Sequence, residues 1–178
     1  MHRLDKEASG LLVVARTPQM FMHLKEQFKQ RQIHKEYIVL VHGKVPKDWD
    51  EITFPIARGA ADRMAALPRS QEGRLPAGAK TAHTEYTVEK RWPHLTLLRV
   101  RLHTGRMHQI RVHFLAYNHP VVGDPLYFQK KRHDKWDIKL GRLFLHSTLL
   151  GFTDLEGNTQ TFASPLPPQL QNFLTNLG

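Results

Sequence analysis

The sequence predicts one α+β domain in which a mixed, mainly antiparallel sheet is flanked by helices and long loops. Apolar and polar residues alternate over 84–89 and 95–102, which is typical of half-exposed strands. Helical spacing of apolar residues begins after residues 17–18 and again after residues 104–105. No repeat or internal linker divides the 178 residues, a length that can bury a core without disulfides, so we expect a single domain over 1–178.

The first elements are an apolar strand and an amphipathic helix. The run GLLVVAR over 10–16 predicts a strand, and Thr17 and Pro18 then supply a helix N-cap and a first helical residue. Over 18–32 the apolar face carries Met20, Leu24 and Phe28, and the other faces carry Lys25, Lys29 and Arg31. This helix should therefore be basic, and a buried strand over 37–41 should follow it.

A loop, two strands and a second helix come next. Residues 58–80 are rich in Gly, Ala and Pro and lack a clear period, so we expect a long mobile loop there. Beyond the strands over 84–89 and 95–102, helical spacing relates Met107, Ile110 and Phe114. A polar row accompanies this apolar stripe: Arg106, Gln109 and His113. A helix should therefore begin where the second strand ends.

The last third should close the sheet. Residues 123–125 form a Gly-Asp-Pro turn, and the basic segment over 129–142 should be a loop or a short helix. Strands are expected over 144–152 and 159–162, around a turn at 156–158. A final amphipathic helix carries Leu170, Phe173, Leu174 and Leu177, with Gly178 as its cap.

Charge and composition narrow the class of protein. The chain has 26 Lys and Arg against 16 Asp and Glu, and its 40% apolar content excludes a disordered basic tail, so a folded basic surface should bind a polyanion such as RNA or DNA. The absence of cysteine excludes disulfides, thiolate zinc sites and cysteine nucleophiles, and fits the cytoplasm. The apolar run 11–15 is far shorter than the roughly 18–20 residues of a membrane span, so no membrane partner is expected.

Several chemistries find no support in the motifs. His103, His108 and His113 are five positions apart, which does not align them on one helix face, and no HExxH motif is present, so no metal is expected. Ser9 lacks the first glycine of a G-x-S-x-G nucleophile turn. The chain also lacks a glycine-rich phosphate loop followed by Lys and Ser or Thr. We therefore expect no metal and no cofactor.

Two dense polar segments remain, over 2–12 and 104–113, and each puts ionisable residues where a strand meets a turn. An Asp in such a position is more often a turn residue or a helix cap than a catalyst. A helix rich in Arg, His and Gln is more often a solvated or phosphate-binding face. Residue spacing alone therefore predicts a basic domain that binds nucleic acid.

These segments resemble signatures of the RluA branch of the RNA pseudouridine synthases. Residues 2–12 (HRLDKEASGLL) are similar to HRLDxxTSGLL, and residues 104–113 (TGRMHQIRVH) to TGRxHQIRVH. Four shorter stretches fit the same family in the same order over essentially the whole chain: Lys35-Glu36-Tyr37 before Val41-His42-Gly43, Lys80-Thr81-Ala82-His83-Thr84, His119-Pro120 through Gly123-Asp124-Pro125-Leu126-Tyr127, and Leu145-His146-Ser147. Two long and four short motifs in register are far more specific than any single pattern.

The resemblance implies the pseudouridine synthase fold and isomerisation of uridine in RNA, with ribosomal RNA favoured over transfer RNA. The sequence does not indicate the oligomeric state, and we expect a monomer. The resemblance makes Asp5 the catalytic aspartate, paired with Arg106, and sets Tyr37 against the target uracil. Substrate-binding roles fall to Arg3 in the RNA stack, Ile110 on the apolar side of the base, and further to Lys35, His108, Gln109 and Arg111. The basic helix 18–32 and the basic residues 130–132 would hold phosphates.

The implied chemistry suits these residue types. Isomerisation breaks N1–C1′ and joins C5 to C1′, so it requires neither a metal nor a redox group. Asp5 could attack C1′, add to C6 or remove the C2′ proton, and each route needs an ionised carboxylate. Tyr37 combines a flat apolar ring with a hydroxyl suited to loss of the C5 proton. The base must first leave its stack, and a side chain such as Arg3 would fill the gap.

The sequence departs from the family pattern in two places. Residue 8 is Ala where the family usually has Thr, which should tune activity without abolishing it. Family members carry roughly fifty residues before the aspartate signature, including a Lys-Pro-x-Gly strand, and Asp5 here follows only four residues. We therefore expect a catalytic domain that lacks its usual N-terminal strands. A non-catalytic RNA-binding module or an inactive truncated fragment is the alternative, and retention of Asp5, Tyr37 and Arg106 together favours the enzyme.

Overall fold

The computed structural model describes residues 2–59, 63–67, 75, 77–128 and 135–177. Most strands form one sheet in the order β1-β8-β2-β7-β6-β3, with β9 added beside β8. The strands of this sheet are β1 (Ser9–Gly10), β2 (His34–His42), β3 (Trp49–Ile52), β6 (Thr84–Arg91), β7 (Leu95–Leu102), β8 (Leu145–Thr153) and β9 (Thr159–Ala163). All neighbouring strands are antiparallel except β1 and β8, which run parallel. The expected mixed, mainly antiparallel sheet is confirmed.

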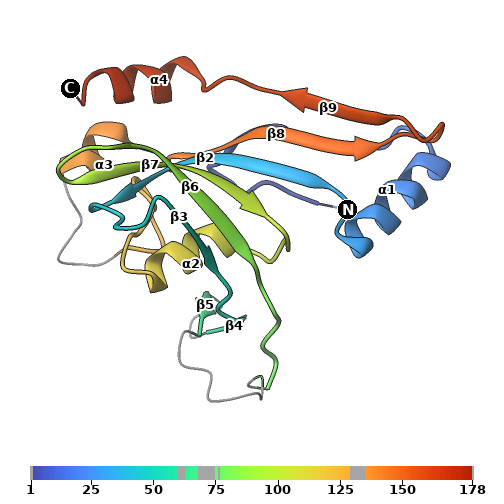
Figure 1. Ribbon diagram of the computed structural model, residues 1–178, viewed down its shortest axis with the longest axis horizontal. Helices are drawn as coiled ribbons and strands as arrows, with labels where there is room; N and C mark the ends of the chain where they lie inside the picture. The colour runs from blue at the N-terminus through green and yellow to red at the C-terminus, as the bar shows by residue number, and fades with distance from the viewer. Residues whose placement is uncertain (1, 60–62, 68–74, 76, 129–134, 178) are drawn as a thin grey trace.

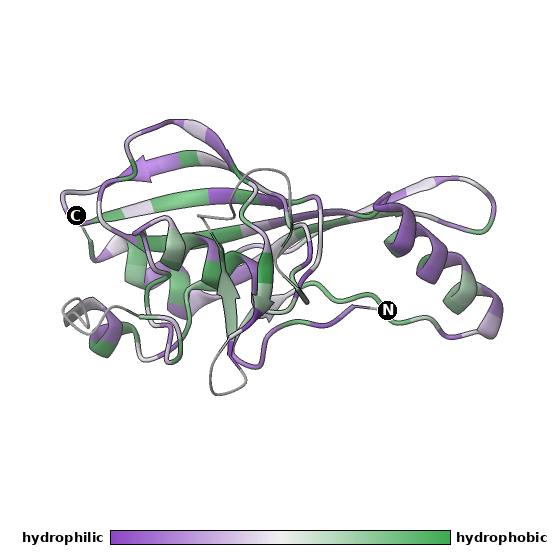
Figure 2. Cartoon of the chain, turned by 90° about the horizontal axis from the view of Figure 1, so that it is seen from below, coloured by the Kyte–Doolittle hydropathy of each residue, from purple (hydrophilic) through white to green (hydrophobic). Residues whose placement is uncertain are grey.

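Four helices accompany the sheet in the described residues: α1 (Pro18–Gln30), α2 (Gln109–Ala116), α3 (Lys135–Leu140) and α4 (Pro168–Thr175). Helix α2 lies on one face of the sheet, whereas α3 and α4 lie on the other (Figure 1). Helix α1 stands at one end, apart from these layers (Figure 1), and its residues are largely hydrophilic (Figure 2). No helix in the described ranges is long and apolar enough to span a bilayer.

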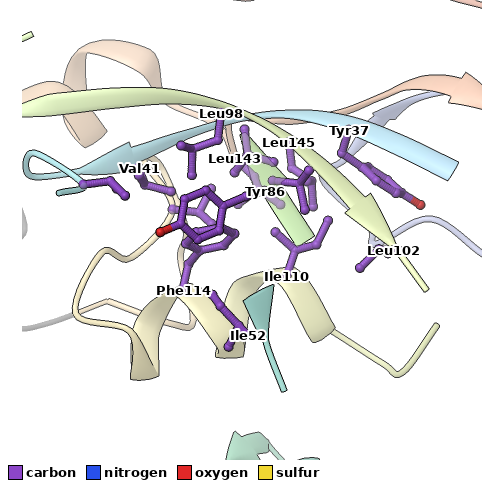
Figure 3. Close-up of a cluster of buried hydrophobic side chains, with 14 residues drawn as sticks. Tyr37, Val41, Ile52, Tyr86, Leu98, Leu102, Ile110, Phe114, Leu143 and Leu145 are labelled. Atoms are coloured by element: carbon purple, nitrogen blue, oxygen red, sulfur yellow. The ribbon is translucent and has the colours of Figure 1, made fainter. Parts of the chain in front are cut away.

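Strand β2 lies inside the sheet, and both of its faces are covered, which explains its continuous apolar run. One set of its side chains packs toward α2: Tyr37, Val39 and Val41. The alternate set packs toward α3 and α4: Ile38 and Leu40. The α2 side is filled largely by aromatic and branched side chains, among them Tyr86, Leu98, Ile110 and Phe114 (Figure 3). This buried layer fixes the orientation of α2 relative to β2.

Helix α1 has the caps that its sequence predicts. The Thr17 hydroxyl accepts a hydrogen bond from the Met20 N–H at 3.2 Å, and Pro18 occupies the first turn. The helix ends at Gln30, two residues earlier than expected, because Arg31 adopts a left-handed conformation with φ 61°. Its apolar side packs into a separate cluster with Ile33 and Leu150.

Several predicted elements differ from the structure. Within the run 10–16 only Gly10 belongs to a strand, since β1 is Ser9–Gly10. The expected loop over 58–80 contains part of a second, two-stranded sheet formed by β4 (Ile56–Arg58) and β5 (Met64–Ala66). Strand β3 was not expected at all. Helix α2 begins at Gln109, so Met107 precedes it and is exposed.

Other predicted elements are confirmed with small shifts in their ends. Strand β7 has the predicted bounds, whereas β2, β6, β8 and β9 extend or move by a few residues. Helix α3 is the short helix expected within 129–142. The basic residues 130–132 and Gly178 lie outside the described residues.

Candidate active site

A cavity of about 580 Å³ opens between the N-terminal segment, the start of β2 and the connection from β7 to α2. Its lining includes every predicted site residue except Arg111: Arg3, Asp5, Lys35, Tyr37, Arg106, His108, Gln109 and Ile110. Residues far apart in the sequence are therefore gathered around one cavity. Its volume lies within the range of small-molecule and nucleoside pockets.

Asp5 is held in the cavity by a short, well-anchored N-terminal segment. The Ala8 N–H donates to the Asp5 carbonyl at 3.0 Å, which closes a turn. Immediately afterwards Ser9 and Gly10 pair with β8. Gly10 has φ 108°, and a Cβ there would run into the Ser147 backbone, so only glycine allows this close pairing. The turn and the strand pairing together fix the position of the Asp5 carboxylate.

Polar side chains reinforce the pairing of β1 with β8. Burial lowers the pKa of His146, so its imidazole is neutral at pH 7. Its Nε2 lies 3.2 Å from the Ser164 carbonyl, which can only accept, so Nδ1 accepts from the Ser9 hydroxyl at 3.0 Å. Arg142 donates to the Ser9 Oγ at 3.1 Å and to the Glu7 carbonyl at 3.3 Å. His146 and Arg142 thus hold the turn that contains Asp5 and the residue that directly follows it.

Arg111, and not Arg106, is the arginine bonded to Asp5. Arg111 Nη1 lies 3.2 Å from Asp5 Oδ2, whereas Arg106 Nε donates to the Thr81 carbonyl at 3.1 Å. The expected pairing of Asp5 with Arg106 is therefore wrong in this structure. Helix α2 explains the difference, because the buried side of its first turn carries Arg111 inward beneath Asp5, while Arg106 precedes the helix.

A buried carboxylate and an aromatic ring hold the Arg111 guanidinium. Its Nε and Nη2 each donate to Asp124, to Oδ2 and Oδ1 respectively, at 2.7 Å. The guanidinium carbon lies 4.9 Å from the centroid of the Tyr127 ring. Burial alone would lower the pKa of Arg111, but its bonds to Asp124 and Asp5 raise it, so the cation is stable. Arg111 therefore presents a fixed positive charge to Asp5.

Tyr127 links this arrangement to the rest of the cavity. Its hydroxyl accepts from the Met64 N–H at 3.0 Å and lies 2.7 Å from His108 Nδ1. Burial lowers the pKa of His108, so its ring is neutral at pH 7. Position 108 has φ 55°, a left-handed conformation that directs the chain into α2. The structure thus brings the predicted His108 into the cavity with its ring held by Tyr127.

Tyr37 and Ile110 form the apolar side of the cavity. Both are buried in the core beneath the sheet, and the Tyr37 hydroxyl points away from the labelled apolar side chains (Figure 3). Burial raises the pKa of Tyr37 to about 12; the Asp5 charge adds to this rise, and a hydrogen bond with Ser147 opposes it. The phenol is therefore neutral at pH 7, with its ring fixed by packing.

Gln109 contributes to the site as a scaffold. Its Oε1 accepts from the Thr104 hydroxyl at 2.8 Å and from the Arg106 N–H at 3.0 Å. Its Nε2 donates to the His83 carbonyl at 3.0 Å and to the Thr84 hydroxyl at 2.9 Å. The amide is thus fully bonded within the protein and is almost completely buried. These contacts position the 104–106 loop, and they leave the amide no free hydrogen for direct contact with a ligand.

Neither Gln109 nor His113 forms the exposed polar row that the sequence suggested. His113 is fully buried, with Nε2 2.9 Å from the Phe54 carbonyl and Nδ1 2.9 Å from the Thr84 hydroxyl. Burial lowers the pKa of His113 to about 4. The carbonyl requires the ring proton on Nε2, so the neutral ring accepts from Thr84. His113 therefore continues the hydrogen-bond network of Gln109 into the core.

The remaining predicted residues supply positive charge. Arg3 is exposed at the cavity, while Lys35 lies deeper and is buried. Two further basic residues of the lining, Lys29 and Arg31, come from the end of α1. The residue pattern over 18–32 predicted a basic helix, but it could not show that the C-terminal end of this helix lies at the cavity.

No group of three metal-ligating side chains occurs within the ranges that the structure describes. The three evenly spaced histidines have separate partners: His103 bonds to Glu85 at 2.7 Å, His108 to Tyr127, and His113 to Phe54 and Thr84. The lining of the cavity supplies a carboxylate, guanidinium and ammonium groups, a phenol and imidazole.

The sequence of this chain is similar to sequences of known proteins. A sequence profile of the family described as "RNA pseudouridylate synthase" matches residues 1–116. An uncharacterized RNA pseudouridine synthase of Chloroflexus aurantiacus is 40% identical over 99% of this chain and 52% of its own length. Ribosomal large subunit pseudouridine synthase D of Nitrosomonas europaea is 38% identical over 98% of this chain and 49% of its own length. The chain spans about half the length of the curated relatives it matches.

Solved structures show the same fold. Human RNA pseudouridylate synthase domain containing 1 superposes with a TM-score of 0.81 and is 26% identical, covering 97% of this chain and 71% of that one. Human RNA pseudouridylate synthase domain containing 4 gives a TM-score of 0.78 at the same identity, covering 99% and 74%.

Proposed function

Because the chain belongs to the RNA pseudouridylate synthase family, we propose that it isomerises uridine to pseudouridine in RNA. The observation that carries the proposal is the Asp5 carboxylate, anchored in a nucleoside-sized cavity and bonded to Arg111 at 3.2 Å. Ribosomal RNA is the favoured substrate, since several relatives are named ribosomal large subunit pseudouridine synthases. Transfer RNA is the second candidate, and the protein would act in the cytoplasm as a monomer.

Asp5 is the proposed catalytic group. Its carboxylate could attack C1′, add to C6 of the uracil or remove the C2′ proton, and each route requires the ionised form. Arg111 places a fixed positive charge 3.2 Å from this carboxylate. The side chain of Asp5 is 16% exposed and that of Arg111 is 5% exposed, so Asp5 is open to the cavity whereas its partner is not. A substrate therefore reaches Asp5 without displacing Arg111.

Tyr37 and Ile110 are proposed to receive the uracil. A flat ring and a branched aliphatic side chain offer an apolar slot for a planar base. After C5 bonds to C1′, the C5 proton must leave. At the same time N1, freed from C1′, must gain a proton, so the isomerisation needs no net proton. The neutral Tyr37 phenol can accept the C5 proton while releasing its own toward N1 or solvent in the cavity. His108 also lines the cavity, and its imidazole is suited to bond to a polar group of the uracil or ribose.

Access to Asp5 requires the target base to leave its stack, which costs a few kcal/mol. Exposed Arg3 lies beside Asp5 and carries a planar guanidinium that can stack in the vacated place. The net charge of +10 supplies the attraction for the RNA backbone. Lys25 and Lys29 on α1 and Arg31 directly after it add to this charge, and Lys29 and Arg31 line the cavity.

The deciding experiment incubates the protein with unmodified bacterial ribosomal RNA and transfer RNA, and maps pseudouridine chemically. We expect wild type to form pseudouridine, mainly in ribosomal RNA, and Asp5→Asn to form none while it still binds RNA. Glu156→Gln, an exposed charge change in the turn between β8 and β9, serves as the control and should match wild type. Equal product from Asp5→Asn would falsify the catalytic role, and RNA binding without product by wild type would favour the non-catalytic alternative.

A further inference from the structure

We propose that Lys35 forms an anion subsite in the cavity, and that this subsite takes a backbone phosphate of the target nucleotide. The phosphate as ligand rests on the proposed RNA substrate, whereas the anion site itself rests on the surroundings of Lys35. The Lys35 residue is only 8% exposed, yet it lines the cavity that contains Asp5 and Tyr37. A buried charge normally has a charged partner within the protein.

Lys35 has no such partner among the described residues. The adjacent carboxylate, Glu36, lies on the other face of β2, where it bonds to His34 at 2.8 Å and to Arg99 at 3.2 Å. Burial lowers the pKa of Lys35, with no compensating effect of a nearby carboxylate. The ammonium therefore faces the cavity with its charge unneutralised.

The groups around the ammonium are uncharged. It lies 5.7 Å from the centroid of the Phe28 ring. Burial, together with the positive charge of Lys35, lowers the pKa of His2 to about 4, so this imidazole is neutral. Gly105 leaves room on the third side, since a Cβ there would come within 3.3 Å of Lys35 Nζ. An aromatic ring, a neutral imidazole and a glycine leave the ammonium open to an anion.

The spacing between Lys35 and Tyr37 suits a nucleotide. Two residues along a strand correspond to roughly 6.6 Å, and both side chains line the cavity. A uracil against Tyr37 would thus place the phosphate of the same nucleotide near Lys35. Lys29 and Arg31, at the end of α1, also line the cavity and could hold the next phosphates. Of these basic residues Lys35 is the buried one, and a charge-assisted hydrogen bond is strongest where water is excluded.

The first test compares Lys35→Met with Lys90→Met. Lys90 also lies over an aromatic ring, 4.7 Å from the centroid of Trp92, but it is exposed and away from the cavity. Loss of one charge-assisted bond should weaken RNA binding by about tenfold in Lys35→Met. The slope of log Kd against log salt should fall by about 0.7, the share of one phosphate on a single strand. Lys90→Met should change neither quantity.

Stability provides an independent readout. A buried, unpaired ammonium destabilises the fold, so Lys35→Met should unfold at the same temperature as wild type or at a higher one. This destabilisation is present while Lys35 is protonated, and it falls as pH rises through the lowered pKa of Lys35. Any stability that Lys35→Met gains over wild type should therefore shrink at high pH. A clear loss of stability in Lys35→Met would assign Lys35 a structural role and overturn the proposal.

A second test uses the wild-type protein. Lysine acylation followed by mass spectrometry should show rapid labelling of Lys35, because its lowered pKa increases the neutral amine. Uridine 5′-monophosphate should protect Lys35, inorganic phosphate should protect it more weakly, and uridine should not. Equal protection by uridine and its monophosphate would contradict the phosphate assignment.

The outcomes separate this inference from the proposed function. Suppose that Asp5→Asn abolishes product while Lys35→Met binds RNA like Lys90→Met. The anion subsite then fails and the synthase assignment stands. Conversely, protection by uridine 5′-monophosphate together with absence of product from wild type would retain the subsite and reject the activity.

Discussion

Asp124 binds the Arg111 guanidinium at two nitrogens, with Nε–Oδ2 and Nη2–Oδ1 distances that are both 2.7 Å. A bidentate pair of this kind fixes the plane of the guanidinium. It leaves Nη1 to bond to Asp5 at 3.2 Å. Asp124 Oδ1 also accepts from the N–H groups of Leu126 and Tyr127, each at 2.9 Å. The backbone that follows Asp124 therefore fixes the position of its carboxylate. The bonds to Asp124 therefore fix the orientation of the Arg111 guanidinium before any substrate binds.

Replacing Asp124 should weaken both the fold and the reaction. Asp124→Asn keeps the shape but removes the charge opposite Arg111, and breaking a buried pair costs about 3–5 kcal/mol. We expect kcat to fall by about tenfold or more, because Arg111 no longer holds its orientation toward Asp5. Urea unfolding and single-turnover pseudouridine formation would measure the two effects.

Glu156→Gln is the matched control for Asp124→Asn, since it removes an exposed carboxylate. It should change stability by less than about 0.5 kcal/mol. If Asp124→Asn lost stability but kept the wild-type kcat, Asp124 would support the fold without positioning Arg111.

The two arginines of the 104–113 segment should respond differently to substitution by lysine. Arg111→Lys cannot make the bidentate bond to Asp124 and reach Asp5 at the same time, so kcat should fall at least about a hundredfold. Arg106→Lys keeps the positive charge but loses the hydrogen bond to the Thr81 carbonyl that orients the side chain at the cavity, so it should mainly raise KM. Steady-state kinetics on one RNA substrate would measure both. The reverse order of effects would restore Arg106 as the partner of Asp5.

The buried His113 predicts a loss of stability in acid. Its pKa is about 4 in the folded protein against 6.5 in the unfolded chain, so the folded state favours the neutral ring. This stabilisation is fully present above pH 6.5 and is lost as pH falls toward 4, by up to about 3 kcal/mol. His113→Gln does not titrate, so its stability deficit relative to wild type should shrink over that range. Urea unfolding at pH 7 and pH 4.5 would measure the change, and a constant deficit would contradict a neutral His113.

Gly10 should tolerate no side chain. Gly10→Ala combines a φ of 108° with contact between the new Cβ and the Ser147 backbone, so we expect a loss of about 2–3 kcal/mol and a lower kcat. Gly157→Ala is the control, because Gly157 has φ 88° with nothing near its Cβ position. It should lose only about 1 kcal/mol and keep the wild-type kcat. Equal effects of the two substitutions would mean that conformational strain alone, and not the pairing of β1 with β8, explains the result.

The main sheet was predictable because its strands carry strong local signals. Strand β7 alternates cleanly, and β2 is an apolar run bounded by turns. Strand β3 (Trp49–Ile52) has two acidic residues among its four, and strand β5 (Met64–Ala66) has only three residues, so neither carries a clear pattern. Both are defined by hydrogen bonds to partner strands. Residues 11–15 are apolar although they form no strand, because alternate side chains of this segment pack into the cluster with α1.

The site was predictable as a set of residues but not as a set of contacts. Motif resemblance selected Asp5, Tyr37 and the 104–113 segment, and the cavity gathers them. Which arginine meets Asp5 depends on where α2 begins, and that start is set by the left-handed His108 and the burial of Gln109. Asp124 and Tyr127 belong to a motif that was recognised, yet their contacts with Arg111 follow only from tertiary packing.

The pairing of Ser9 with β8 also governs when the protein becomes competent during its synthesis. The hydroxyl of Ser9 bonds to His146, a residue that lies 137 positions later. A ribosome must therefore translate β8 before β1, which follows the loop of Asp5, has its partner strand, and loop closure over such a distance is slow compared with local folding. The basic residues of α1, by contrast, emerge early and carry their charge before the helix can pack against Leu150 of β8. A nascent chain could thus attract RNA well before it could act on it.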